Sequence, residues 1–178
     1  MCNFYKGNVI FGYEDGTLDG LNGETGRLAW EHRMEDQIRW RQKVVEDGVF
    51  LAGWDGKLHI VDLNNGKKVA QVEIGAPTGT TPAVFGDRVY FGTENGDFFG
   101  INWRKAEIDW TFQSKVGFHA YRSSAAVSKE LVTVGARSKR VFGLDPVTGD
   151  QLWEFAAKGR IDSSPEIGRA HVSTPVTS

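Results

Sequence analysis

The fold is decided by residues 20–30, which read Gly20-Leu21-Asn22-Gly23-Glu24-Thr25-Gly26-Arg27-Leu28-Ala29-Trp30. A strand ends at the Asn, a Thr-Gly pair turns the chain, and a second strand carries the Trp. The pattern returns complete at residues 143–153 and in degenerate form at residues 60–70 and 100–110. A motif that is present four times predicts a repeat architecture.

Three landmarks keep the same spacing in every copy of the motif. They are a small residue, a polar residue ten positions later and an aromatic position eight further on. Copy by copy, they are Gly12, Asn22 and Trp30; Ala52, Asp62 and Ala70; Gly92, Asn102 and Trp110; and Gly135, Asp145 and Trp153. The steps between copies are 40, 40 and 43 residues, so an insertion lengthens one loop after Trp110. The shared phase excludes a chance resemblance among the copies.

Composition sets limits on the class of protein. The 178 residues are 40% hydrophobic, which supports a packed core for one domain or for a piece of a larger one. The net charge of −2 gives no electrostatic footprint for nucleic acid, so we expect no such partner. There is no apolar run of transmembrane length, so this segment is not expected to insert into a membrane. Cys2 is the only cysteine, which excludes an internal disulfide and a cysteine-cluster metal site.

Each copy reads as four short strands. In the third copy they are predicted at residues 81–85, 88–93, 97–102 and 108–113, and alternating residues such as Val89 and Phe91 share one face. Gly16, Gly56 and Gly96 follow Asp or Asn and mark tight hairpins between second and third strands. The fourth copy has Lys139 at that position, which predicts a different turn. The sequence therefore predicts an all-β fold of four-stranded antiparallel units without a helix.

The motif resembles the tryptophan-docking motif of the pyrroloquinoline-quinone (PQQ)-like β-propeller repeat. That superfamily includes quinoprotein alcohol dehydrogenases and BamB-type outer-membrane assembly lipoproteins. The resemblance spans roughly residues 5–167 and implies about four blades of a propeller that usually closes with seven or eight. It also implies that Trp30, Trp110 and Trp153 are mostly buried, each against the third strand of its own blade or against an adjacent blade. Lys105-Ala106 in place of Thr-Gly, and Ala70 in place of Trp, predict weaker individual blades.

The end of the chain departs from the repeat. Residues 162–167 are expected to form the first strand of a fifth blade, so residues 1–167 are assigned to a partial ring of PQQ-like repeats. Residues 168–178 resemble the translated read-through of a sequencing-library adapter. We therefore expect residues 168–178 to be a non-native tail and exclude them from fold reasoning.

The resemblance implies a function without catalysis. The expected function is a BamB-like propeller scaffold that mediates protein–protein interaction in the periplasm or cell envelope. The alternative is a PQQ-dependent quinoprotein oxidoreductase whose cofactor site lies mostly in blades outside this sequence, and a third possibility is a sensor propeller fused to a kinase or hydrolase. The quinoproteins of the family use a vicinal Cys-Cys disulfide, a Trp platform and calcium ligands beside a catalytic Asp. This sequence has no Cys pair and no recurring acidic cluster, so we expect no catalytic, cofactor-binding or metal-binding residue, and no cofactor.

Three arginines form a candidate binding site at the mouth of the channel. Arg39 and Arg122 share a repeat position with Gly79 and Asp162, which in the resembled family begins the innermost strand. Arg41 lies two residues after Arg39 and would share its face. A basic spot at the channel mouth would bind an anion or an acidic peptide. The alternative is solvated charge or pairing between blades.

Two tryptophans and three histidines complete the candidates. Trp54 and Trp103 lie at loop positions outside the core pattern, where exposed aromatics would anchor a protein partner. The alternative is that they are ordinary isolated surface aromatics. His32, His59 and His119 follow no ligand spacing and are expected to be exposed or half-buried strand residues.

Overall fold

The structure is a computed structural model that describes residues 2–34, 37–38, 42–46, 48–115 and 120–166. This part of the chain consists of sixteen strands, turns and loops, without a helix. The strands are β1 (Cys2–Tyr5), β2 (Asn8–Gly12), β3 (Thr17–Asn22), β4 (Leu28–Arg33), β5 (Lys43–Val45), β6 (Gly48–Ala52), β7 (Lys57–Asp62), β8 (Lys68–Glu73), β9 (Ala83–Phe85), β10 (Arg88–Gly92), β11 (Asp97–Asn102), β12 (Glu107–Gln113), β13 (Ala126–Val127), β14 (Val132–Ala136), β15 (Arg140–Leu144) and β16 (Gln151–Ala156).

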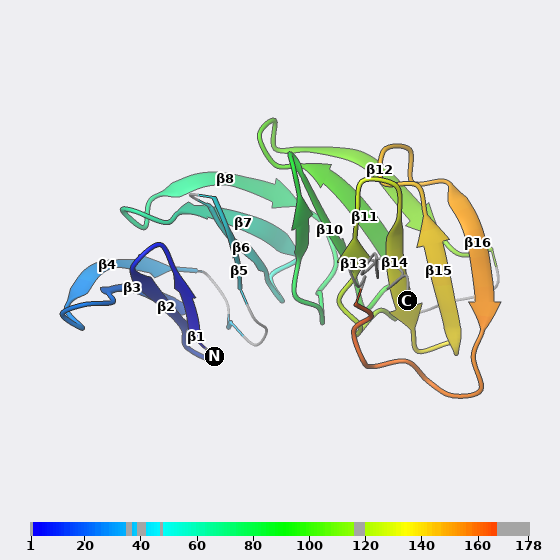
Figure 1. Ribbon diagram of the computed structural model, residues 1–178, viewed down its shortest axis with the longest axis horizontal. Coiled ribbons are helices and arrows are strands. Elements are labelled where there is room, and N and C mark those ends of the chain that lie inside the picture. Colours follow the sequence, from blue (N-terminus) through cyan, green and yellow to red (C-terminus); the bar gives the residue numbers. More distant parts are fainter. Residues whose placement is uncertain (1, 35–36, 39–41, 47, 116–119, 167–178) are drawn as a thin grey trace, which may run out of the picture.

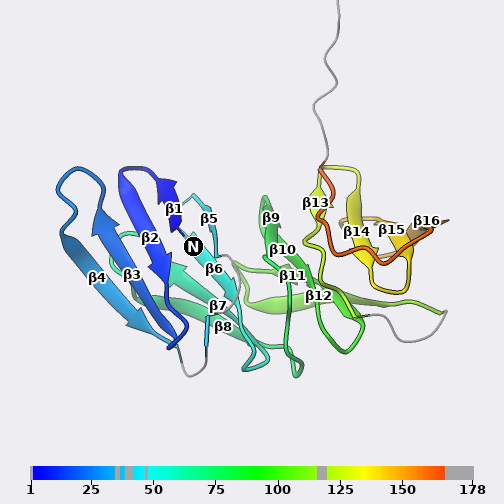
Figure 2. The same ribbon diagram turned by 90° about the horizontal axis from the view of Figure 1, so that it is seen from below.

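The strands form four antiparallel sheets of four, each in chain order. We call them blades one (β1–β4), two (β5–β8), three (β9–β12) and four (β13–β16). Figure 1 shows the blades side by side along an arc, in the order of the chain. The first strands of neighbouring blades contact each other, β1 with β5, β5 with β9 and β9 with β13, and Figure 2 shows them on the same side of the arc. The predicted all-β architecture of four-stranded blades is confirmed.

The hydrophobic core lies between the blades. Side chains alternate along each strand between the two faces of a blade. Ile10 of β2 in blade one and Val89 of β10 in blade three both point toward blade two. Three apolar clusters result, one at each interface between consecutive blades. A single blade has no partner for either face, so the stability of each blade depends on its neighbours.

The hairpins between second and third strands use a left-handed residue in all four blades. Gly16, Gly56 and Gly96 have φ of 88°, 72° and 88°, as the sequence predicts. The prediction of a different turn at Lys139 is wrong, because Lys139 takes the same conformation with φ of 65°. Its backbone N–H donates to Ala136 O at 3.2 Å, as Gly16 N–H donates to Tyr13 O at 3.2 Å. The pairing of β14 with β15 therefore holds a lysine in a conformation that favours glycine.

Trp30 and Trp110 close two of the interfaces in the same way. Trp30 is 7% exposed, lies flat on Gly20 of its own blade and donates its Nε1–H to Leu63 O of blade two at 2.8 Å. Its ring also faces Gly66, where a Cβ would lie only 2.5 Å from a ring carbon. Trp110 makes the same contacts with Pro146 O, at 3.3 Å, and with Gly149 of blade four. The tryptophan of one blade thus docks on the turn between the third and fourth strands of the next.

Trp153 differs from the other two tryptophans. It lies on Gly143 of its own blade, as expected, but its side chain is 40% exposed. The prediction that it is buried is wrong, because the described residues contain no blade that covers this face of blade four.

The residues after β16 form no strand as far as Glu166. The expected strand over 162–167 is therefore wrong for its described part, since no neighbouring strand among the described residues pairs with it. Ser164 Oγ instead accepts a hydrogen bond from Ser124 N–H at 3.1 Å. Residues 167–178 lie outside the described residues, so their assignment to a non-native tail stays a prediction. The described ranges contain no helix long and apolar enough to cross a membrane.

Candidate functional site

The strands of every blade end on two opposite sides of the arc, and these sides carry different loops. One side carries the hairpins between second and third strands and the segments that link blades, and we call it the connection face. Backbone bonds join these loops, such as Glu94 N–H to Pro77 O at 2.9 Å. The opposite end, the turn face, carries the two other turns of each blade, joined by bonds such as Trp103 N–H to Asp87 O at 3.0 Å. Sites on these two faces cannot contact the same small patch of a partner.

Arg122 lies on the connection face and is paired with the neighbouring blade. Its Nε and Nη2 donate to the two carboxylate oxygens of Glu94 at 2.9 and 3.4 Å. Glu94 belongs to the hairpin of blade three, whereas Arg122 precedes the first strand of blade four. Arg39 and Arg41 lie outside the described residues. Binding of an anion at this channel mouth therefore stays a prediction, and Arg122 is neutralised by a bidentate partner.

The same two repeat positions form a second ion pair between a hairpin and a linking segment. In blade four the hairpin carries Arg137, whose Nε lies 3.2 Å from Asp162 Oδ1. The signs are reversed relative to Glu94 and Arg122, but the geometry recurs. Exposed pairs of this kind contribute little stability, so their main effect is to hold the rim residues in defined positions.

Trp54 takes the hairpin position of Glu94 and Arg137 in blade two. The linking segment opposite it carries Gly79, so no ion pair forms there. The Trp54 side chain is 41% exposed. Trp54 therefore adds an exposed aromatic side chain to the connection face, in the blade that precedes the one carrying Glu94.

Trp103 lies on the turn face, away from Trp54, and is half-buried between blades two and three. Its ring meets Phe50 edge-on, with centroids 5.3 Å apart, and its Nε1–H donates to Gly86 O at 3.0 Å. The guanidinium of Arg104 covers the ring at 4.3 Å. Trp54 and Trp103 therefore do not form one surface, and the role of each in binding a partner stays a prediction.

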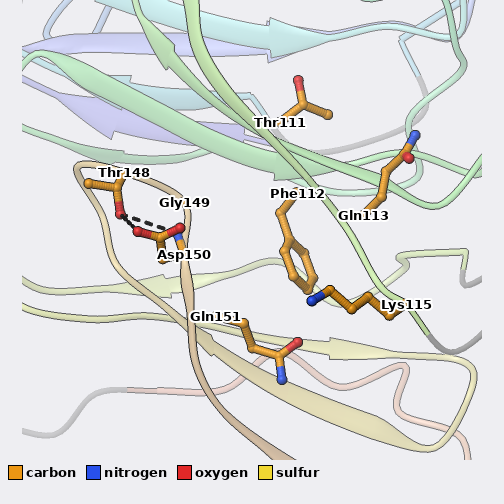
Figure 3. Close-up of a pocket in the computed structure, with 8 residues that line it drawn as sticks. All are labelled: Thr111, Phe112, Gln113, Lys115, Thr148, Gly149, Asp150 and Gln151. Carbon is orange, nitrogen blue, oxygen red and sulfur yellow. Dashed lines mark hydrogen bonds between the residues drawn. The ribbon is translucent and has the colours of Figure 1, made fainter.

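A polar groove of about 520 Å³ lies between blades three and four. Figure 3 shows its two walls, formed by β12 on one side and by the turn that leads into β16 on the other. Thr148 and Asp150 bind each other across this turn, with Thr148 Oγ1 donating to Asp150 Oδ2 at 2.8 Å. The lining residues are Thr111, Phe112, Gln113, Lys115, Thr148, Gly149, Asp150 and Gln151. Sequence reasoning missed this groove because its walls meet only through the stacking of blades.

His32 and His59 are brought together at the interface between blades one and two. His59 is 4% exposed, and its Nε2 lies 2.6 Å from Asp55 Oδ2, so the expectation of an exposed or half-buried side chain is wrong for this residue. His32 Nδ1 lies 2.8 Å from Gly66 O, and burial lowers the pKa of His32 below its ordinary value. His119 is outside the described residues. Among the residues that the structure describes, no group of three His, Cys, Asp or Glu is arranged to hold a metal ion.

The recurring Asn and Asp at the ends of the third strands serve the turns that follow. Asn22 Oδ1 accepts the backbone N–H of Thr25 at 2.9 Å. Asp145 Oδ1 accepts the N–H groups of Val147 and Thr148 at 2.7 and 2.9 Å. The bonds from Thr148 and Val147 hold the pKa of Asp145 below its ordinary value. These side chains are committed to turn geometry.

Most of this sequence is similar to known proteins. The family model described as "Outer membrane protein assembly factor BamB" matches residues 14–178. The chain belongs to this family. It is 27% identical to the outer membrane protein assembly factor BamB of Shewanella oneidensis, over 89% of this chain and 43% of that protein. It is also 23% identical to the quinoprotein ethanol dehydrogenase of Pseudomonas aeruginosa, over 70% of this chain and 24% of that enzyme.

A solved member of the BamB family has the same fold. The crystal structure of BamB from Moraxella catarrhalis superposes with a TM-score of 0.76 at 22% identity, and the match covers 87% of this chain and 47% of that one. The likeness confirms the propeller architecture predicted from the repeat. The chain spans less than half the length of the BamB relatives that it matches.

Proposed function

We propose that this chain is a non-enzymatic propeller scaffold that binds other proteins in the cell envelope, as part of outer-membrane protein assembly. The observation that carries the proposal is the BamB family match over residues 14–178. A fold of stacked blades suits such a role, because its hairpins and linking segments are held by bonds between neighbouring blades. Loops on a rigid frame lose little conformational freedom when they bind.

The connection face is the surface proposed to contact the partner. Trp54 supplies an exposed aromatic side chain, a residue type enriched among the strongest contributors to protein interfaces. The Glu94–Arg122 pair on the same face supplies two paired charges of opposite sign that help to orient an approaching partner. Trp103 is half-buried between blades two and three and lies on the turn face, so it is not part of this surface.

A chimera tests the proposal. This chain replaces the aligned segment of BamB in Shewanella oneidensis, and the amount of assembled outer-membrane protein is measured in cells that lack the native gene. We expect the chimera to restore assembly and Trp54→Ala to reduce it. Ile108→Ala is the matched control, since Ile108 is equally exposed but lies on the outer strand β12. A folded, abundant chimera that restores no assembly would contradict the scaffold function. Full activity of Trp54→Ala would contradict the proposal that the connection face binds the partner.

The similarity to a quinoprotein ethanol dehydrogenase favours one alternative function. In that case the blades would help to seat PQQ and calcium for alcohol oxidation. The chain is titrated with PQQ and calcium while the reduction of an electron-accepting dye by ethanol is followed. Saturable activity that falls when residues of these four blades are changed would replace the scaffold proposal.

A further inference from the structure

A cavity of about 180 Å³ opens on the turn face, between blades two and three. Its lining includes Ile60 and Val69 of blade two and Trp103 of blade three. The chain itself supplies the blades on both sides of this cavity. The cavity is therefore a feature of this part of the ring, whatever covers the outer faces of blades one and four.

The cavity exists because this interface departs from the docking motif. β8 carries Ala70 at the repeat position of Trp30 and Trp110. At the flanking interfaces the ring at that position fills the space between its own third strand and the turn of the next blade. Here Trp103 reaches in from blade three, and a cavity remains beside it. An apolar cavity of roughly 150 Å³ holds one benzene ring, so this one has room for a single aromatic side chain.

The inner part of the cavity is apolar. Ile60 is fully buried and Trp103 is half-buried, whereas Val69 is 57% exposed and marks the mouth. An aromatic ring that enters from the turn face contacts these side chains and covers Val69. The apolar surface that is thereby removed from water favours binding.

Charges at the mouth decide the sign of the segment that can approach. Glu46 and Asp62 line the cavity, and Arg104 is the one cation among its lining residues. Arg104 Nη2 donates to Glu46 Oε2 at 3.0 Å and its Nε donates to Asp87, so one guanidinium serves two carboxylates. Asp62 Oδ1 accepts the backbone N–H of Asn64 at 2.7 Å, and Asp62 forms no ion pair with any described residue. The mouth therefore carries a net negative charge that attracts a cation.

We propose that this cavity binds one aromatic side chain of a partner protein, on a segment where a lysine or arginine stands next to the aromatic residue. The ring lies against Ile60, Val69 and Trp103, and the neighbouring cation pairs with Asp62. An acidic segment is disfavoured, because it brings a like charge against Asp62 and Glu46. The cavity and the connection face lie on opposite sides of the arc, so this second binding site does not rest on the proposed function.

Peptide titration of the full chain tests the proposal. The probe is a capped tripeptide of lysine, phenylalanine and lysine, and the methyl NMR signals of Ile60 and Val69 are followed as it is added. We expect saturable shifts at millimolar peptide, because a single side chain is the main anchor. A tripeptide with glutamate in place of both lysines, and one with alanine in place of phenylalanine, should each bind at least about tenfold more weakly. No shift at Ile60 and Val69, or equal binding of the acidic peptide, would overturn the proposal.

A matched pair of charge variants locates the cation of the peptide. Asp62→Asn removes the charge and keeps an oxygen for the turn, as Asn22 and Asn102 do at the same repeat position in blades one and three. This variant should bind the basic peptide at least about threefold more weakly. Asp145→Asn makes the same change at the same repeat position in blade four and should bind like wild type.

A second matched pair locates the aromatic ring. Val69→Ser removes the apolar side chain at the mouth and should also weaken binding, followed through the Ile60 methyl signals. Leu152→Ser is the control, because Leu152 occupies the same repeat position in blade four and is 53% exposed. Both substitutions are at exposed positions, so the urea midpoints should stay close to wild type. Binding that is unchanged in both Asp62→Asn and Val69→Ser would overturn the proposal, and so would equal weakening by the two blade-four controls.

Discussion

The interface between blades two and three differs from the interfaces on either side of it. At the flanking interfaces the tryptophan comes from the fourth strand of the earlier blade, as Trp30 and Trp110. At the middle interface that strand carries Ala70, and the tryptophan comes instead from the turn of the later blade, as Trp103. Trp103 packs against Phe50 of blade two. At this interface the later blade therefore supplies the aromatic side chain that the earlier blade supplies elsewhere.

The exchange involves all four residues that surround the docking position. Where the other blades pair Gly with Trp, blade two pairs Ile60 with Ala70. The turns of blades two and four have Leu63 and Pro146, each with a glycine three residues later. The turn of blade three has Trp103 and Ala106 at these two positions. A cavity of about 180 Å³, lined in part by Ile60 and Trp103, remains beside them. In the sequence the two departures from the motif stand in different copies, but in the structure they meet at one interface.

Removing the aromatic side chain should show the largest difference between the two kinds of interface. Trp110→Ala is expected to cost about 3–5 kcal/mol in the free energy of unfolding, because the ring is buried and hydrogen-bonded. Trp103→Ala should cost less, because that ring is only half-buried and borders a cavity. Urea denaturation of both variants measures the two losses. Equal losses would show that Trp103 stabilises its interface as much as Trp110 stabilises its own.

The turn position that faces the tryptophan gives the next largest contrast. Gly149→Ala should cost about 1–3 kcal/mol from overpacking, because a Cβ there lies 2.5 Å from the Trp110 ring, with strain added by φ of 77°. Ala106→Gly should stay within about 1 kcal/mol of wild type, because Ala106 already occupies a left-handed conformation with φ of 56° that suits glycine. Thermal unfolding of both variants tests this. A larger loss for Ala106→Gly would mean that its methyl group is essential to the middle interface.

Restoring the motif at the middle interface should work only when all its parts are restored. Ala70→Trp alone is expected to destabilise by about 1–3 kcal/mol, because Ile60 occupies the surface on which such a ring lies flat elsewhere. The combination of Ile60→Gly, Ala70→Trp, Trp103→Leu and Ala106→Gly should recover most of that loss. The free energies of unfolding of both variants give the coupling between the substitutions. A single Ala70→Trp variant as stable as wild type would show that the four positions are independent.

The smallest expected effect is a pH dependence specific to the interface of blades one and two. Burial lowers the pKa of His32 from its ordinary value of 6.5, so the unfolded chain binds this proton more tightly than the folded one. Stability should be complete above pH 6.5 and should fall as the pH drops from there toward the lowered folded pKa. His32→Gln should flatten this part of the curve, measured by urea denaturation at each pH. His59, its partner Asp55 and Lys68 also face this region. If His32→Gln leaves the curve unchanged, His32 is not the source of the dependence.

The distance along the chain between interacting residues explains which features of the candidate surfaces could be predicted and which could not. The hairpin glycines and the Asn or Asp turns were predictable because each acts on residues two to five positions away. The conformation of Lys139 was not, since strand pairing on both sides overrides the preference of the residue itself. The pairing of Arg122 with Glu94 was open from the sequence, because the two residues come from consecutive blades.

The sequence by itself determined the repeat, the number of blades, the strands of the third blade to within one or two residues and the positions of Trp30 and Trp110. These features follow from alternation and turn signals that are local in the chain. Only the tertiary structure decided that Trp103 replaces the missing tryptophan at Ala70, that His59 is buried and that Trp153 is left exposed. Each of these depends on which face of one blade lies against the next. That contact joins residues far apart in the chain, and no local pattern encodes it.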